Sequence, residues 1–272
     1  MKKVAYQLTT LSSLIVSPRS DRAFYRDLDD SIEEFCSKQS DDDNNNNKQK
    51  LDKSKLKIIY PFYRYGEYES YSPEQAEYYL PGSSIKGALT NPNGEGPNTS
   101  HKFMFDDIKI DGGSVVLCNL YKLQYVNDAK NTCFETFFEN VGVEMVKART
   151  TLKGEFYAED MTAAKELLGK ANCITRKKIK QLIAYLEDVK KTDHGCADDI
   201  GNILEKLVPL KEKDNIILLG GYKGLLHSIC LDNHAVDVNK AVFIDAYEDK
   251  NKNHKATYLP HGLLQIDLNT TA

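Results

Sequence analysis

The residues best suited to chemistry in this chain lie in a glycine and serine turn that runs into an apolar helix start, Pro81-Gly82-Ser83-Ser84-Ile85-Lys86-Gly87-Ala88-Leu89. Glycines in such a turn let the main chain approach a ligand closely or take a positive φ. Ser83 or Ser84 can cap the following helix, whose positive end favours an anion, and Lys86 adds a mobile cation. We therefore expect this turn to bind a phosphate.

The phosphate could belong to a nucleotide or to a polynucleotide backbone. Gly82 and Gly87 have the G-x-x-x-x-G spacing of a P-loop, but a P-loop has Lys and then Ser or Thr directly after the second glycine. Ala88 and Leu89 stand there instead. The spacing therefore disfavours ATP or GTP, and a purely structural tight turn stays open as an alternative.

The string from Pro81 to Leu89 resembles the signature of the RAMP proteins, the RNA-binding subunits of type III CRISPR effector complexes. Within that superfamily it is most similar to the Csm-type (type III-A) subunit that caps the backbone filament at the 3′ end of the guide RNA. Three further stretches are similar to the family's glycine-rich loop, closing proline-glycine strand and short acidic strand: Leu219 to Leu226, Leu259 to Ile266 and Phe103 to Ile108.

The resemblance implies two sets of RNA-binding residues. One set would hold guide-RNA phosphates and comprises Gly82, Ser83, Ser84, Lys86 and Gly87. The other would let a second loop approach the same backbone, with Lys223 as a cation and Tyr222 as a base stacker, and comprises Gly220, Gly221, Tyr222, Lys223 and Gly224. No cofactor, metal site or catalytic residue is expected.

The function implied is that of a non-catalytic crRNA-binding subunit of a type III CRISPR ribonucleoprotein in antiviral defence. Its partners would be crRNA, other RAMP subunits and, indirectly, target RNA. Two alternatives stay open. One is a RAMP endoribonuclease acting on crRNA or target RNA, and the other is a protein interaction module that binds no RNA.

An endoribonuclease of the metal-dependent kind needs carboxylates that converge in space. The N-terminal region offers Asp21, Asp27, Asp29 and Asp30. The last three precede Glu33 and Glu34 in a pattern typical of a helix start, where acidic side chains favour the helix dipole. The adjacent Asp106 and Asp107 would face opposite sides of a strand. These acids therefore predict structure rather than catalysis.

Cysteine and histidine spacing gives no metal motif. The six cysteines include no C-x-x-C pair, and free thiols in a reducing compartment are the expected state. His194 and Cys196 form one close pair without a second at zinc-finger spacing. His254 and His261 flank a predicted strand and are expected at the surface.

The 272 residues have 41% apolar and 28% charged side chains, which is typical of a globular chain. No apolar run approaches the ~20 residues that span a bilayer, so we expect a cytoplasmic protein without a membrane segment. The net charge of −4 is unfavourable for RNA binding by the chain alone. A local basic stretch, Arg176 to Lys180, suggests that RNA is held by one face within an assembly.

Interleaved strands and helices without a Rossmann fingerprint predict an α+β fold. Strands are expected at 4–16, 56–63, 114–126, 142–157, 216–219, 241–245 and 263–268. Helices are expected at 22–36, twice within 161–191 with a break at 169–172, and at 197–207 before Pro209. The polar segment 37–55 is expected to be a mobile insertion.

The resemblance makes the fold more definite. It implies a ferredoxin-like (RRM-like) RAMP fold of one or two fused β-α-β-β-α-β units with a helical insertion. The expected regions are 1–160 for the N-terminal RAMP part, 161–207 for the helical insertion and 208–272 for the strands and glycine loop that complete the fold.

Six tyrosines precede or begin the phosphate turn, and each could stack on an RNA base or pack within the protein. They are Tyr63, Tyr65, Tyr68, Tyr71, Tyr78 and Tyr79.

Overall fold

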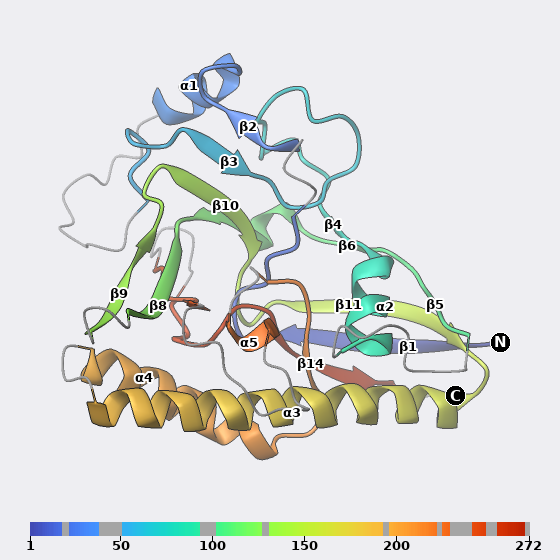
Figure 1. Ribbon diagram of the computed structural model, residues 1–272. Helices are drawn as coiled ribbons and strands as arrows, with labels where there is room; N and C mark the ends of the chain where they lie inside the picture. Colours follow the sequence, from blue (N-terminus) through green and yellow to red (C-terminus); the bar gives the residue numbers. More distant parts are fainter. Residues whose placement is uncertain are drawn as a thin grey trace.

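The computed structural model describes residues 1–17, 22–37, 51–92, 102–126, 131–192, 196–221, 225–228, 241–248 and 255–269. Over these residues the chain has a mixed α+β architecture in which nearly every strand pairing is antiparallel. Figure 1 shows one long helix running beneath a sheet, with smaller sheets on the other side of the molecule. The expected α+β class is confirmed.

The largest sheet has the strand order β12-β14-β1-β11-β5, and all of its pairings are antiparallel. Its strands are β1 (Lys2–Thr10), β5 (Met104–Phe105), β11 (Thr151–Ala158), β12 (Ile216–Leu218) and β14 (Leu263–Leu268). Alternate residues of β1 are buried, because successive side chains of a strand point to opposite faces. The sheet thus joins strands from both ends of the chain.

Two helices pack together in the core beside this sheet. The helix α2 (Gly82–Thr90) lies in sequence between β1 and β5, and α3 (Met161–Thr192) lies between β11 and β12. Ile85 and Leu89 of α2 belong to the same buried cluster as Leu167 and Leu168 of α3. The position of α2 is therefore set by the packing of its apolar side.

The expected break within 161–191 is wrong, because α3 is one helix of 32 residues. A glycine inside a helix costs only ~1 kcal/mol relative to alanine, and tertiary packing outweighs this. The first half of α3 packs in the cluster with α2, whereas Ile179, Leu182 and Leu186 pack in a second, larger cluster. One continuous helix therefore connects both cores.

The larger cluster lies mainly among the remaining elements, although Leu80 and Ile108 belong to the cluster with α2. One sheet has the order β2-β3-β10-β7, a second has β13-β8-β9, and a third pairs β4 with β6. Their bounds are β2 Phe24–Tyr25, β3 Ile58–Tyr60, β4 Tyr79–Leu80, β6 Ile108–Lys109, β7 Val115–Cys118, β8 Leu120–Val126, β9 Asn131–Phe137, β10 Val141–Val146 and β13 Val242–Ile244. The remaining helices are α1 Asp30–Ser37, α4 Ala197–Leu207, α5 Leu225–Ser228 and the 3₁₀ turns Gly112–Ser114 and Val208–Glu212.

The strand expected at 142–157 is two strands in different sheets. Its first part is β10, paired with β3 and β7, and its second part is β11, paired with β1 and β5. Residues 147–150 carry the chain from one sheet to the other. The strand expected at 4–16 likewise ends at Thr10.

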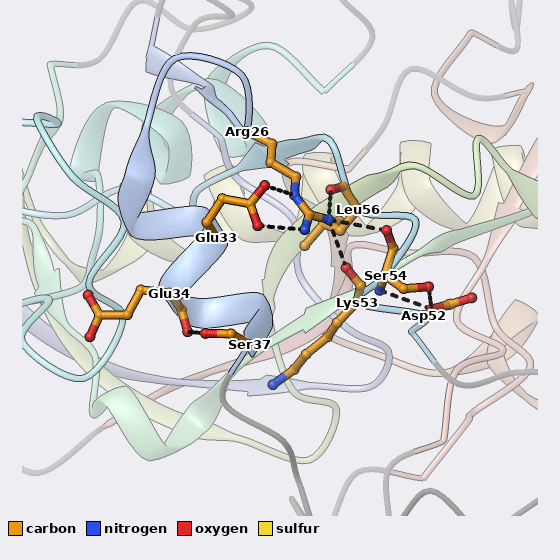
Figure 2. Close-up of polar contacts among 8 residues, drawn as sticks. All are labelled: Arg26, Glu33, Glu34, Ser37, Asp52, Lys53, Ser54 and Leu56. Carbon is orange, nitrogen blue, oxygen red and sulfur yellow. Dashed lines mark hydrogen bonds and ion pairs between the residues drawn. The ribbon is translucent and has the colours of Figure 1, made fainter.

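The interval 37–55 includes residues that pack onto α1. Arg26 forms a two-pronged ion pair with Glu33, at 2.8 Å and 2.7 Å, and its Nη1 donates to the carbonyl oxygens of Ser54 and Leu56 at 3.1 Å and 3.3 Å (Figure 2). Leu51 is 9% exposed and joins the larger core. Residues 51–55 are therefore part of the packed body, and the rest of the predicted insertion, 38–50, lies outside the described residues.

No helix among the described residues has the length and apolar content needed to cross a bilayer. Within the same residues, no three His, Cys, Asp or Glu side chains gather as a metal site would require.

Candidate functional site

The predicted phosphate turn forms the start of α2. Pro81 is the N-cap residue, with extended backbone and no side-chain cap, and the helix begins at Gly82. Ser83 and Ser84 lie inside the helix, so the expectation that one of them caps it is wrong. The helix ends at Thr90, before Asn91 and Pro92.

The positive end of α2 already faces an anion from the chain itself. The amide of Gly82 donates to Oδ1 of Asp107 at 2.7 Å, and the neighbouring Asp106 is also exposed. Both aspartates lie between β5 and β6 rather than on a strand. The Asp107 carboxylate at the helix end disfavours a phosphate at that position.

Gly82 is required by internal packing. A Cβ atom at this position would lie 2.2 Å from the carbonyl oxygen of Phe105 and 2.9 Å from that of Asp106. The backbone of α2 therefore approaches β5 too closely for any side chain. This close approach is intramolecular, so Gly82 is needed for the fold whether or not a ligand binds.

The exposed side of α2 has a different character. Ser83, Lys86 and Gly87 are exposed and lie three to four residues apart on one helix face, while Ser84 is half-buried. No described atom outside the helix lies within 4 Å of the position that a Cβ of Gly87 would take. Among the described residues Lys86 has no ion pair.

Gly87 is therefore an exposed helical glycine that no described part of the fold requires. It costs about 0.5–1 kcal/mol relative to alanine. It leaves bare backbone at the position next to Lys86 in the sequence. An external polyanion could approach this surface closely and be neutralised by the lysine. We call Ser83, Lys86 and Gly87 the α2 face.

The second glycine motif follows β12. Gly220 and Gly221 have φ values of +60° and +85°, and the amide of Gly221 donates to the carbonyl of Ile15 at 2.7 Å. A Cβ on Gly220 would lie 2.3 Å from that same oxygen. These glycines are thus required by conformation and packing. Tyr222, Lys223 and Gly224 lie outside the described residues.

The two motifs share one core. The helix α2 contacts β12, and Ile217 and Leu219 are buried in the same cluster as Ile85 and Leu89. The strand that leads into the second loop therefore lies against the helix that carries Lys86.

The tyrosines divide into buried and accessible ones. Tyr71 and Tyr78 are 4% and 2% exposed, so neither can stack on a base. Tyr65 is 47% exposed and stacks on Tyr79, with ring centroids 4.2 Å apart and an angle of 14° between the rings. Tyr79 directly precedes Leu80 and α2. Tyr65 remains a candidate base stacker beside the α2 face.

A buried carboxylate explains why two of these tyrosines turn inward. Glu144 of β10 accepts hydrogen bonds from the hydroxyls of Tyr78 at 2.7 Å and Tyr71 at 3.1 Å and from the amide of Phe62 at 2.9 Å. Burial raises the pKa of Glu144 and also the pKa values of Tyr71 and Tyr78. An acid within the apolar run Val-Gly-Val-Glu-Met-Val is the sequence signal for this cluster.

Replacing Glu144 with glutamine should change how stability depends on pH. In the folded protein Glu144 keeps its proton at pH values above 4.5, which is the ordinary pKa at which the unfolded chain releases the proton. Stability is therefore lost as the pH rises from about 4.5 through the folded pKa. Glutamine cannot ionise, so the variant does not lose this stability. The unfolding free energy of Glu144→Gln minus that of the original protein should therefore increase as the pH rises over this range. Urea titrations at several pH values measure this, and parallel pH profiles would contradict it.

A second buried polar cluster lies at the end of β1. Asp245 is 1% exposed and accepts from the amide of Ser13 at 3.1 Å and from Oγ1 of Thr257 at 3.0 Å. The hydroxyl of Ser12 donates to the carbonyl of Pro260 at 2.6 Å. His261, expected at the surface, is 4% exposed. These groups hold the closing turn against β1, while His254 lies outside the described residues.

The basic stretch 176–180 is largely neutralised. Arg176 pairs with Glu212 and Asp214, and Lys180 pairs with Glu212 at 2.8 Å. Lys178 is 3% exposed. The expected basic face is therefore not an open anion-binding surface at this position.

Comparison with known proteins gave matches among solved structures. No protein-family model matches the chain, and no curated protein matches it. Among solved structures, the chain is similar to a chain of a Csm-crRNA-target RNA ternary complex from a type III-A CRISPR-Cas system. The two are 11% identical over 97% of this chain and 100% of that chain, with a TM-score of 0.46.

Proposed function

We propose that this chain is a non-catalytic guide-RNA-binding subunit of a type III CRISPR ribonucleoprotein, located at the cap of the backbone filament near the crRNA 3′ end. The carrying observation is the α2 face, where Lys86, which has no ion pair among the described residues, is followed by an exposed glycine that no described part of the fold requires. This face lies within the segment that resembles the RAMP signature. Its ligand is the phosphate backbone of crRNA.

The arrangement of elements supports the ferredoxin-like part of the proposal. A β-α-β-β-α-β pattern is formed, in chain order and with other elements in between, by β1, α2, β5, β11, α3 and β14. Their strands lie in the order β14-β1-β11-β5, so β11 separates β1 from β5 as in a split β-α-β unit. In this proposal β12 adds an edge strand and α4 extends the helical part.

The charge balance supports a role within an assembly. Phosphate neutralisation supplies most nucleic-acid affinity, and a chain of net charge −4 supplies little of it alone. Neighbouring RAMP subunits would bring the RNA to the α2 face. Tyr65 could then stack on a base, which is worth ~1–3 kcal/mol for each stacked base.

Replacing Lys86 with alanine tests this proposal. RNA affinity should fall by a similar factor for all sequences, and the slope of log K against log salt should become shallower by about one unit, because one phosphate contact is lost. The measurement is a salt titration of RNA binding by the reconstituted complex.

Lys57→Ala is the matched control, since Lys57 is also exposed and its loss changes the net charge equally. It begins the segment that leads into β3, in a different sheet from α2. The control should keep the original slope. Equal slopes for all three proteins would remove Lys86 from the RNA surface.

A further inference from the structure

A second basic site lies where the chain crosses between sheets. A cavity of about 470 Å³ opens between the end of β10 and the start of β11. No described Asp or Glu lines it. The polar and charged residues that line it are Ser114, Lys147, Arg149, Thr150, Thr151 and Lys255.

Arg149 is held in an unusual backbone conformation at this site. Its φ is +64°, in the left-handed region that favours glycine. Such a conformation costs about 1–2 kcal/mol for a residue with a side chain. An exposed arginine therefore stands where glycine would serve the turn better. Strain of this kind is found preferentially at ligand-binding positions.

The cations at the cavity are available to a ligand. Arg149 and Lys255 are exposed, and neither forms an ion pair with another residue that the structure describes. The hydroxyl groups of Thr150, Thr151 and Ser114 add hydrogen-bond donors. A cavity that has positive charge and hydroxyl donors, and no carboxylate among its described lining residues, favours an anion.

The crossover loop that lines the cavity is held by a buried threonine at the end of β1. Thr10 donates through Oγ1 to the carbonyl of Lys147 at 2.7 Å and accepts from the amide of Thr150 at 2.8 Å. Its backbone carbonyl accepts from the amide of Arg149 at 2.6 Å, and its amide donates to the carbonyl of Thr150 at 3.0 Å. The crossover loop is therefore held in one conformation before any ligand arrives, which lowers the entropy cost of binding.

We propose that this crossover cavity binds a phosphate group, separately from the α2 face. Arg149 is placed to form a two-pronged contact with phosphate oxygens, and Lys255 adds a point charge. The volume lies within the ~300–1,000 Å³ typical of small-ligand sites, so the phosphate can carry an attached ribose. No aromatic side chain among the described residues lines the cavity, so we expect it to read the backbone and not the base.

The inference rests on the proposed function in one respect, namely that RNA is the source of this phosphate. Free phosphate or a nucleotide has the same chemistry and is the other source.

Arg149→Gly separates a binding role from a folding role. Glycine relieves the left-handed conformation while it removes the cation, so the melting temperature should stay the same or rise.

Two probes are compared on the full chain at low salt. The first is a short labelled single-stranded RNA, for which Arg149→Gly should lower affinity on the order of tenfold, as expected for a charge-assisted hydrogen bond. The salt slope should fall by ~0.7, the contribution of one phosphate on a single strand. The second probe is inorganic phosphate at matched ionic strength, read as a rise in melting temperature. Arg149→Lys keeps the charge but not the two-pronged geometry, so it should retain the original salt slope and recover only part of the affinity.

Each outcome decides the inference. Weaker RNA binding by Arg149→Gly supports the cavity with RNA as its ligand. Stabilisation of the original protein by inorganic phosphate that Arg149→Gly lacks, with RNA binding unchanged, supports the cavity with a free phosphate as its ligand. No change with either probe overturns it. If Lys86→Ala weakens RNA binding and Arg149→Gly changes the result with neither probe, the inference fails and the proposed function stands. If Arg149→Gly alone weakens RNA binding, the cavity is retained and the α2 face is rejected.

Discussion

Replacing Gly82 with alanine is expected to lower the free energy of unfolding by about 3 kcal/mol, the upper part of the ~1–3 kcal/mol range for overpacking a core. The added Cβ would lie 2.2 Å from the carbonyl oxygen of Phe105. A backbone oxygen cannot rotate away, so α2 must shift from β5 and the bond from Gly82 to Asp107 must lengthen. At ~2–4 °C per kcal/mol, the melting temperature should fall by roughly 6–12 °C.

Gly169→Ala is the matched control for thermal unfolding. Gly169 is exposed within α3 and has open space around its missing side chain, so alanine should stabilise this helix by up to ~1 kcal/mol. If Gly82→Ala melted at the same temperature as the original protein, the close packing of α2 on β5 would be wrong.

The sequence predicts the helix at the glycine turn but not the anion that faces its N-terminus. A local pattern shows that Ile85 and Leu89 lie on one side of a helix that ends before Pro92. The bond between Gly82 and Asp107 spans 25 positions and depends on where β6 pairs with β4. Contacts of this kind follow from tertiary packing, which a local pattern does not contain.

The element boundaries predicted from the sequence are wrong for related physical reasons. Residues 147–150 contain no glycine, proline, asparagine or aspartate, so no turn signal marks the crossover between β10 and β11 within the run 142–157. The glycine that suggests a break in α3 costs less than the packing on either side of it provides. Burial on both faces of a strand and on both halves of a long helix is decided by the whole fold.

The functional assignment of the tyrosines also needed tertiary information. Tyr65 and Tyr78 have the same chemical character in the sequence, but Tyr78 is buried against Glu144 and Tyr65 is exposed. Glu144 in the apolar strand β10 indicates that hydrogen-bond donors must lie in the core, since a buried carboxylate needs them. It does not identify which tyrosines supply them.

Replacing Gly87 with glutamine is expected to release RNA without harming the fold. Glutamine is a better helix former than glycine and meets no described atom outside the helix within 4 Å of its Cβ, so stability should rise by up to ~1 kcal/mol. Its side chain would cover the bare backbone beside Lys86 and keep a phosphate strand away. Guide-RNA binding should therefore fall at least about tenfold, the effect of losing one close charged contact.

Gly169→Gln is the control, because Gly169 is also an exposed helical glycine with open space around it. Both variants should therefore gain similar stability. The most direct measurement is the amount of guide RNA retained by the reconstituted complex with each variant, alongside the thermal unfolding of each isolated chain. The RNA-binding account predicts that Gly87→Gln loses guide RNA and Gly169→Gln keeps it. Equal retention of guide RNA by both variants, at equal stability, would contradict the assignment of the α2 face to RNA.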